Sequence, residues 1–158
     1  LKGLAVTIIF LAFPHEFDSV LDGMVYAAIT ALGFAATENL LYLYFAGYGE
    51  GGYAGLGALF VLRVILGGWG HAVYTSFIGI GLAVARLRPE PWLKVAAPLA
   101  GWLAAVFLHA LHNTMATVFI ASFGLGGLAA TLLVDWVSWA IALGIVCWAI
   151  LRERRWVR

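Results

Sequence analysis

Apolar runs of about twenty residues or more fill most of this chain and constrain its fold more than any other feature. Four of them cover roughly residues 21–46, 58–85, 95–123 and 128–151, and a shorter one covers 4–13. A helix needs about 20 apolar residues to cross the ~30 Å hydrocarbon layer of a bilayer. Transmembrane barrel strands would instead be short and alternating. The sequence therefore predicts an all-α polytopic membrane protein with four full transmembrane helices and one partial amino-terminal helix.

The composition excludes a soluble globular domain. Of the 158 residues, 64% are apolar and 11% are charged, whereas soluble domains have about 45–50% and ~25%. The one cysteine, Cys147, allows neither an internal disulfide nor a multi-thiolate metal site. We expect a single integral membrane domain over 1–158. Because the run at 4–13 is too short to span, we also expect the chain to be a fragment with upstream helices missing.

The basic residues are segregated along the chain. Seven of the nine Lys and Arg residues lie in 86–94 or 152–158, and the glycine-rich connections 47–57 and 124–127 contain none. Cytoplasmic loops of membrane proteins are enriched in Lys and Arg. The pattern therefore predicts that the two glycine-rich loops face outward and that segment 14–20 and the carboxyl terminus face the cytoplasm.

Several polar side chains interrupt the apolar spans, where such groups are costly and raise a functional question. At 1.5 Å of rise per residue, Glu38 lies ~12 Å below the outer boundary, His112 and Asn113 ~15–17 Å, and His71 and His109 ~21 Å. Three helices thus bring a carboxylate, imidazoles and an amide to one layer. We predict that these groups converge on a single cavity without a bound metal ion.

The local patterns suit such a cavity, although each also has a structural explanation. His109 and Asn113 are four residues apart and face the same way on a helix, so they can hold a carbonyl and its oxyanion. Three glycines beside His71 leave room for water or a substrate. Alternatively, Glu38 and Asn39 join helices by hydrogen bonds, the glycines permit close packing, and a lone histidine packs.

Arg63 and Asp135 differ from this group. Their estimated depths, ~9 Å and ~11 Å, would let them meet across the second and fourth expected spans. Because unpaired charges are expensive inside a membrane, we predict a structural ion pair between them.

The order of these motifs resembles the PrsW family of intramembrane proteases, relatives of the CAAX prenyl endopeptidases and bacteriocin-processing proteins. The resemblance rests on segments 1–4, 17–26 and 33–39, on Arg63, on Gly70-His71-Ala72 and on His109-Ala110-Leu111-His112-Asn113. Such proteins carry a Glu-Glu-x-x-Lys motif, a Glu-Asn helix, a helix with a histidine and a His-x-x-x-Asn or Asp helix. Lys2, Asn39 and His112 fall within these motifs. Lys2 matches the motif lysine, so the two glutamates would precede Leu1 and this fragment would be inactive.

The resemblance implies an intramembrane glutamate endopeptidase that cleaves a membrane-anchored, anti-sigma-factor-like protein near the outer face. An upstream glutamate would activate a water that Glu38 helps to hold, and His71, His109 and Asn113 would orient the water and stabilise the oxyanion. The expected partners are this substrate and the lipid bilayer of a bacterial or archaeal cell membrane. No cofactor and no nucleic-acid partner are expected.

Three other functions remain open from the residues alone. A zinc peptidase could draw ligands from Glu38, His71, His109 and His112, although no His-Glu-x-x-His motif is present. A transporter or channel could use the buried Glu and His residues to relay protons or bind an ion. A chain without the glutamate pair could also serve as a membrane scaffold.

Overall fold

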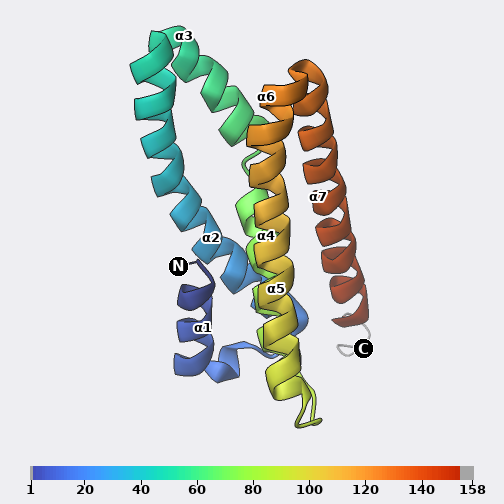
Figure 1. Ribbon diagram of the computed structural model, residues 1–158. Helices are drawn as coiled ribbons and strands as arrows, with labels where there is room; N and C mark the ends of the chain where they lie inside the picture. The colour runs from blue at the N-terminus through green and yellow to red at the C-terminus, as the bar shows by residue number, and fades with distance from the viewer. Residues whose placement is uncertain (1, 154–158) are drawn as a thin grey trace.

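The computed structural model describes residues 2–153, and this part of the chain contains helices and no strand (Figure 1). The fold is therefore all-α, as predicted. Its elements in order are α1 (Lys2–Ala12), η1 (Pro14–Glu16), α2 (Val20–Tyr42), η2 (Leu43–Tyr48), α3 (Gly49–Phe60), η3 (Val61–Leu66), α4 (Gly70–Leu87), α5 (Leu93–Thr114), η4 (Met115–Phe119), α6 (Ile120–Phe123) and α7 (Leu125–Glu153). Element η1 is a 3₁₀ turn, whereas η2, η3 and η4 are π-helical.

Within residues 2–153, three helical stretches are long and apolar enough to cross a membrane: Val20–Leu87, Leu93–Phe123 and Leu125–Arg152. The expectation of four full spans is thus corrected to three, because the first two expected spans belong to one stretch of 68 residues. The other two expected spans are present, and α1 is a shorter apolar helix. Many large apolar side chains are exposed on these helices, as contact with lipid tails requires.

The glycine-rich segment 47–57, expected as a loop, is helical instead. A helix satisfies every backbone N–H and C=O internally, which favours it wherever water is scarce, even at glycine. The chain nevertheless reverses here, because Gly52 adopts φ 57° and ψ −150°, a conformation essentially reserved for glycine. Figure 1 shows α2 and α3 as two arms that meet at this bend.

Helix α4 is the centre of the molecule. It packs against α1, α2, α5 and α7, and twelve of its eighteen residues are buried. Glycines allow the closest approaches: a Cβ on Gly79 would collide with the backbone of Gly23 in α2, and one on Gly101 of α5 would collide with the backbone of Phe77. Close backbone contact through small residues is typical of helices packed in membranes.

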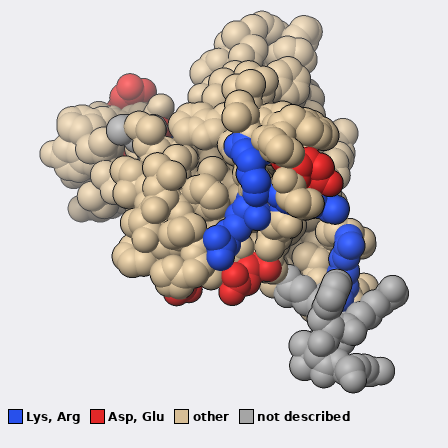
Figure 2. Space-filling view, turned by 90° about the horizontal axis from the view of Figure 1, so that it is seen from below, with Lys and Arg blue, Asp and Glu red and all other residues tan. Residues whose placement is uncertain are grey.

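The connections between the helices lie at the two ends of the bundle. At one end, Ser19 caps α2 in a reciprocal capping box with Asp22, which satisfies two backbone N–H groups. Asp18 lies 3.9 Å from Arg86 at the end of α4. Figure 2 shows Lys and Arg side chains as a stripe across this end. The basic residues expected at 154–158 lie outside the described part of the chain.

Candidate active site

The polar residues singled out in the sequence lie around one cavity of about 640 Å³. Those that line its wall come from five elements: α2, η3, α4, α5 and α7. The lining includes Glu38, Asn39, Arg63, His71, His109, His112, Asn113 and Asp135. The structure therefore brings the three expected helices together, and a fourth helix, α7, adds a second carboxylate.

Glu38 and His71, two of the four residues expected to be catalytic, lie in direct contact. His71 lies in the first turn of α4, and its Nε2 is 3.0 Å from Oε2 of Glu38. The two groups are close enough to attract each other, although Oε2 is buried and no described donor is aligned for a hydrogen bond to it. The nearby imidazole and a more distant guanidinium of Arg63 are therefore the polar neighbours of this buried oxygen.

Lys2 approaches the same imidazole from the opposite side. Its Nζ is within hydrogen-bonding distance of Nδ1 of His71, and its ammonium also lies 4.6 Å from the ring centroid of Phe34. With Lys2 as an ammonium group, which has donors and no acceptor, Nδ1 accepts this bond and a neutral imidazole carries its hydrogen on Nε2. The matched motif lysine thus touches a site histidine directly.

The partner of Arg63 differs from the expected one. Its Nη2 is 3.8 Å from Oε2 of Glu38, its Nε donates to Oδ1 of Asn39 at 3.2 Å, and its guanidinium stacks on Tyr42. The predicted ion pair between Arg63 and Asp135 is therefore wrong. Depth along the membrane was a poor guide here, because the rotation of each helix decides which neighbour a side chain meets.

His109 lies beside His71, with ring centroids 5.4 Å apart. Asn113, one turn further along α5, lines the cavity with it. The four-residue spacing thus puts an imidazole and an amide on one wall, as the helical periodicity predicted.

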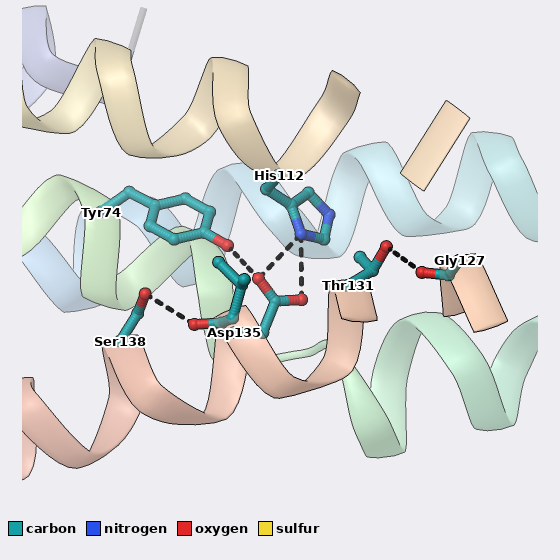
Figure 3. Close-up of polar contacts among 7 residues, drawn as sticks. Tyr74, His112, Gly127, Thr131, Asp135 and Ser138 are labelled. Carbon is teal, nitrogen blue, oxygen red and sulfur yellow. Dashed lines mark hydrogen bonds and ion pairs between the residues drawn. The ribbon is translucent and has the colours of Figure 1, made fainter. Parts of the chain in front are cut away.

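Asp135, which also lines the cavity, binds two partners (Figure 3). The hydroxyl of Tyr74 donates to its Oδ1 at 2.7 Å, and Nδ1 of His112 lies 2.9 Å from the same atom. Tyr74 was not among the site residues predicted from the sequence. Its signal was its position three residues after His71 on the same helix, which places both side chains on one face.

The comparison with known proteins decides the family. A family profile described as "PrsW family intramembrane metalloprotease" matches residues 1–151. The chain belongs to the PrsW family. Two curated relatives carry the name Protease PrsW: one from Oceanobacillus iheyensis is 35% identical over 105 residues, and one from Geobacillus kaustophilus is 31% identical over 110 residues. No solved structure gives a significant match.

The alignments with these PrsW relatives are partial. Each covers 66% of this chain, but 44% of the first relative and 42% of the second. The chain therefore spans less than half of the length of the curated relatives it matches. The resemblance seen in the motifs is confirmed at the level of the family.

The PrsW family description names a metalloprotease, so the ligand set matters. A catalytic zinc ion takes three protein ligands and a water. Among residues 2–153, no group of three or more His, Cys, Asp or Glu side chains is placed to hold a metal ion. Both nitrogens of His71 face other groups, and two cations, Lys2 and Arg63, lie beside the pair it forms with Glu38. The described residues alone therefore do not fit a metal centre.

Proposed function

We propose that this chain forms the core of an intramembrane endopeptidase that hydrolyses a peptide bond in a membrane-anchored protein. The observation that carries the proposal is the meeting of Glu38, His71 and His109, from three different helices, at one cavity of an otherwise apolar bundle. Ionisable groups in such a setting are expensive, and they are retained where they do chemistry. Membership of the PrsW family supports the same class of activity.

The proposed reaction is attack of water on the scissile carbonyl. A carboxylate takes one proton from the water while the water oxygen forms a bond to the carbonyl carbon. The same proton later passes to the departing amine nitrogen as the C–N bond breaks. Glu38 helps to hold the water. By the family resemblance, the second carboxylate comes from a Glu-Glu motif upstream of Lys2 and acts as the general base.

The neighbouring groups would stabilise the charge that develops on the carbonyl oxygen. His109 and Asn113 offer hydrogen-bond donors from one wall of the cavity, and a donor of this kind contributes about 10²–10³-fold to the rate. His71, held between Lys2 and Glu38, keeps the carboxylate in place. We propose a single-span, anti-sigma-factor-like protein of a bacterial or archaeal cell membrane as the substrate, cut near the outer face.

Three substitutions in the full-length parent test this function. Glu38→Gln, His71→Ala and His109→Ala should each lower the cleavage of a single-span substrate by about 10²-fold or more, because each removes a partly buried polar group beside the reacting atoms. Matched controls are Glu50→Gln and His15→Ala, which change exposed residues of the same types. Parental rates in the His71 and His109 variants, measured at equal membrane content, would contradict the assignment.

The family description makes a metal-dependent peptidase the second candidate. Its distinguishing property is loss of activity with a chelator and recovery with added zinc. Because the described residues do not build a three-ligand site, we expect the full-length parent to cleave its substrate at an unchanged rate after chelator treatment. Reversible inhibition would favour the metal-dependent candidate and would place its ligands partly outside the described chain.

A further inference from the structure

A second polar cluster lies in the same cavity, apart from the contact between Glu38 and His71. Asp135 of α7 is only 2% exposed, and it binds Tyr74 of α4 and His112 of α5 (Figure 3). Both carboxylate oxygens are within reach of Nδ1 of His112, at 2.9 and 3.0 Å. A charge buried in an apolar bundle is strongly unfavourable without such partners. The cluster therefore joins three helices at one point.

This cluster lies next to the proposed catalytic residues. His112 follows His109 by three residues on α5, as Tyr74 follows His71 on α4. The ring of Tyr74 stacks on His109 with centroids 5.9 Å apart, and lies equally far from the ring of His112. The hydrogen bonds to Asp135 consequently fix an aromatic side chain that touches the site.

The contacts also determine how His112 is protonated. An ionised carboxylate only accepts hydrogen bonds, so Nδ1 of His112 carries the hydrogen that faces Asp135. In the neutral ring, Nε2 then has a free lone pair. Nε2 makes no hydrogen bond to the described residues, and His112 lines the cavity.

We propose that His112 offers Nε2 as a hydrogen-bond acceptor to a backbone N–H of the substrate segment in the cavity. Asp135 and Tyr74 are positioning residues that hold His112 in the required tautomer. The inference rests on the proposed function, since it needs a peptide in the cavity. A peptide opened for cleavage inside a membrane exposes N–H groups that lack water partners, so an acceptor in the cavity lowers the cost of holding it there.

The tautomer can be measured without any assay of activity. In the full-length parent, labelled with ¹⁵N-histidine in detergent micelles, the nitrogen shifts of His112 should show a protonated Nδ1 and an unprotonated Nε2 at neutral pH. A ring protonated on both nitrogens, or on Nε2 alone, would overturn the proposal. Because this measurement uses the unmutated protein, it tests the proposed tautomer even if a variant of His112 fails to fold.

Cleavage by His112→Asn tests the role of the acceptor. The shorter amide keeps an N–H toward Asp135 but has no atom at the place of Nε2. We expect kcat/KM to fall about 10- to 100-fold while the melting temperature in detergent stays near that of the parent. Parental kcat/KM in this variant would overturn the inference.

The positioning role of Asp135 is tested by combining variants. Asp135→Asn alone should lower kcat/KM, but it should add little to the loss already caused by His112→Asn, because it acts through that residue. Losses that multiply independently would show that Asp135 acts elsewhere. The Glu38→Gln variant is measured in parallel. If it cleaves at the parental rate, the proposed role of Glu38 is refuted, but the results for His112 can still be interpreted.

Discussion

At the scale of single residues, Arg63 has the most informative environment. Its guanidinium touches Glu38, Asn39 and Tyr42 on α2, although Arg63 itself belongs to η3, after the bend at Gly52. It therefore ties the two arms of the long helical stretch together beside the candidate site. A charge-assisted contact of this kind contributes roughly 1–3 kcal/mol to stability.

We expect Arg63→Ala to lower both stability and cleavage, since it frees Glu38 and leaves Asn39 without its partner. Arg63→Lys keeps the charge but not the planar group that stacks on Tyr42, so it should recover only part of each loss. The matched control is Arg88→Ala, in the exposed connection between α4 and α5. Melting temperature and cleavage rate, measured on the same preparations, check this. An Arg63→Ala variant indistinguishable from the parent would contradict it.

The sequence could predict which residues share the cavity but not every contact among them. Helical rise and periodicity are local properties, so counting residues was enough to predict that Glu38, His71 and His109 lie close together. The partner of Arg63 and the role of Tyr74 depend on how whole helices rotate against each other, which counting does not give. The catalytic roles of the cavity residues remain predictions.

At the scale of elements, the glycines show why sequence and structure differ at 47–57. Glycine is favoured in soluble loops because its backbone is solvated and flexible. In this chain most glycines of the segment stay helical, and Gly52 alone supplies the reversal. The π-helical segments η2, η3 and η4 were also missed. Each is a local widening of a helix, and the pattern of apolar residues is too coarse to show it.

The packing of α2 against α4 depends on Gly23 and Gly79, whose backbones touch. Gly79→Ala should therefore force the helices apart and cost about 1–3 kcal/mol. Gly33→Ala is the matched control, because a Cβ on this exposed glycine of α2 meets nothing within 4 Å. Gly33→Ala should leave stability unchanged, or raise it by up to about 1 kcal/mol because alanine has the higher helix propensity. Thermal unfolding in detergent measures both, and equal effects would show that the backbone contact does not hold the helices together.

At the scale of the whole molecule, the two ends of the helical bundle differ both in the connections they contain and in their charge. The bend at Gly52 and the turn between α6 and α7 lie at one end, whereas the connection between α4 and α5 lies at the other (Figure 1). The first end has the acid Glu50 and no Lys or Arg in 47–57 or 124–127, and the second has three basic residues in 86–94. We therefore propose that the second end and the carboxyl terminus are cytoplasmic.

Cysteine labelling in intact cells can test this orientation on a background in which Cys147, the one native cysteine, is replaced by serine. Gly51→Cys and Gly126→Cys are suitable outer probes, because a Cβ at either position meets nothing within 4 Å. An impermeant maleimide should modify both and should spare Glu90→Cys until the membrane is opened. Labelling of Glu90→Cys alone in intact cells would reverse the orientation. If only one of the two outer probes is labelled, the arrangement that places both at one end is contradicted. The probes at Gly51 and Gly126 would then lie on opposite sides of the membrane, although the fold places them at the same end.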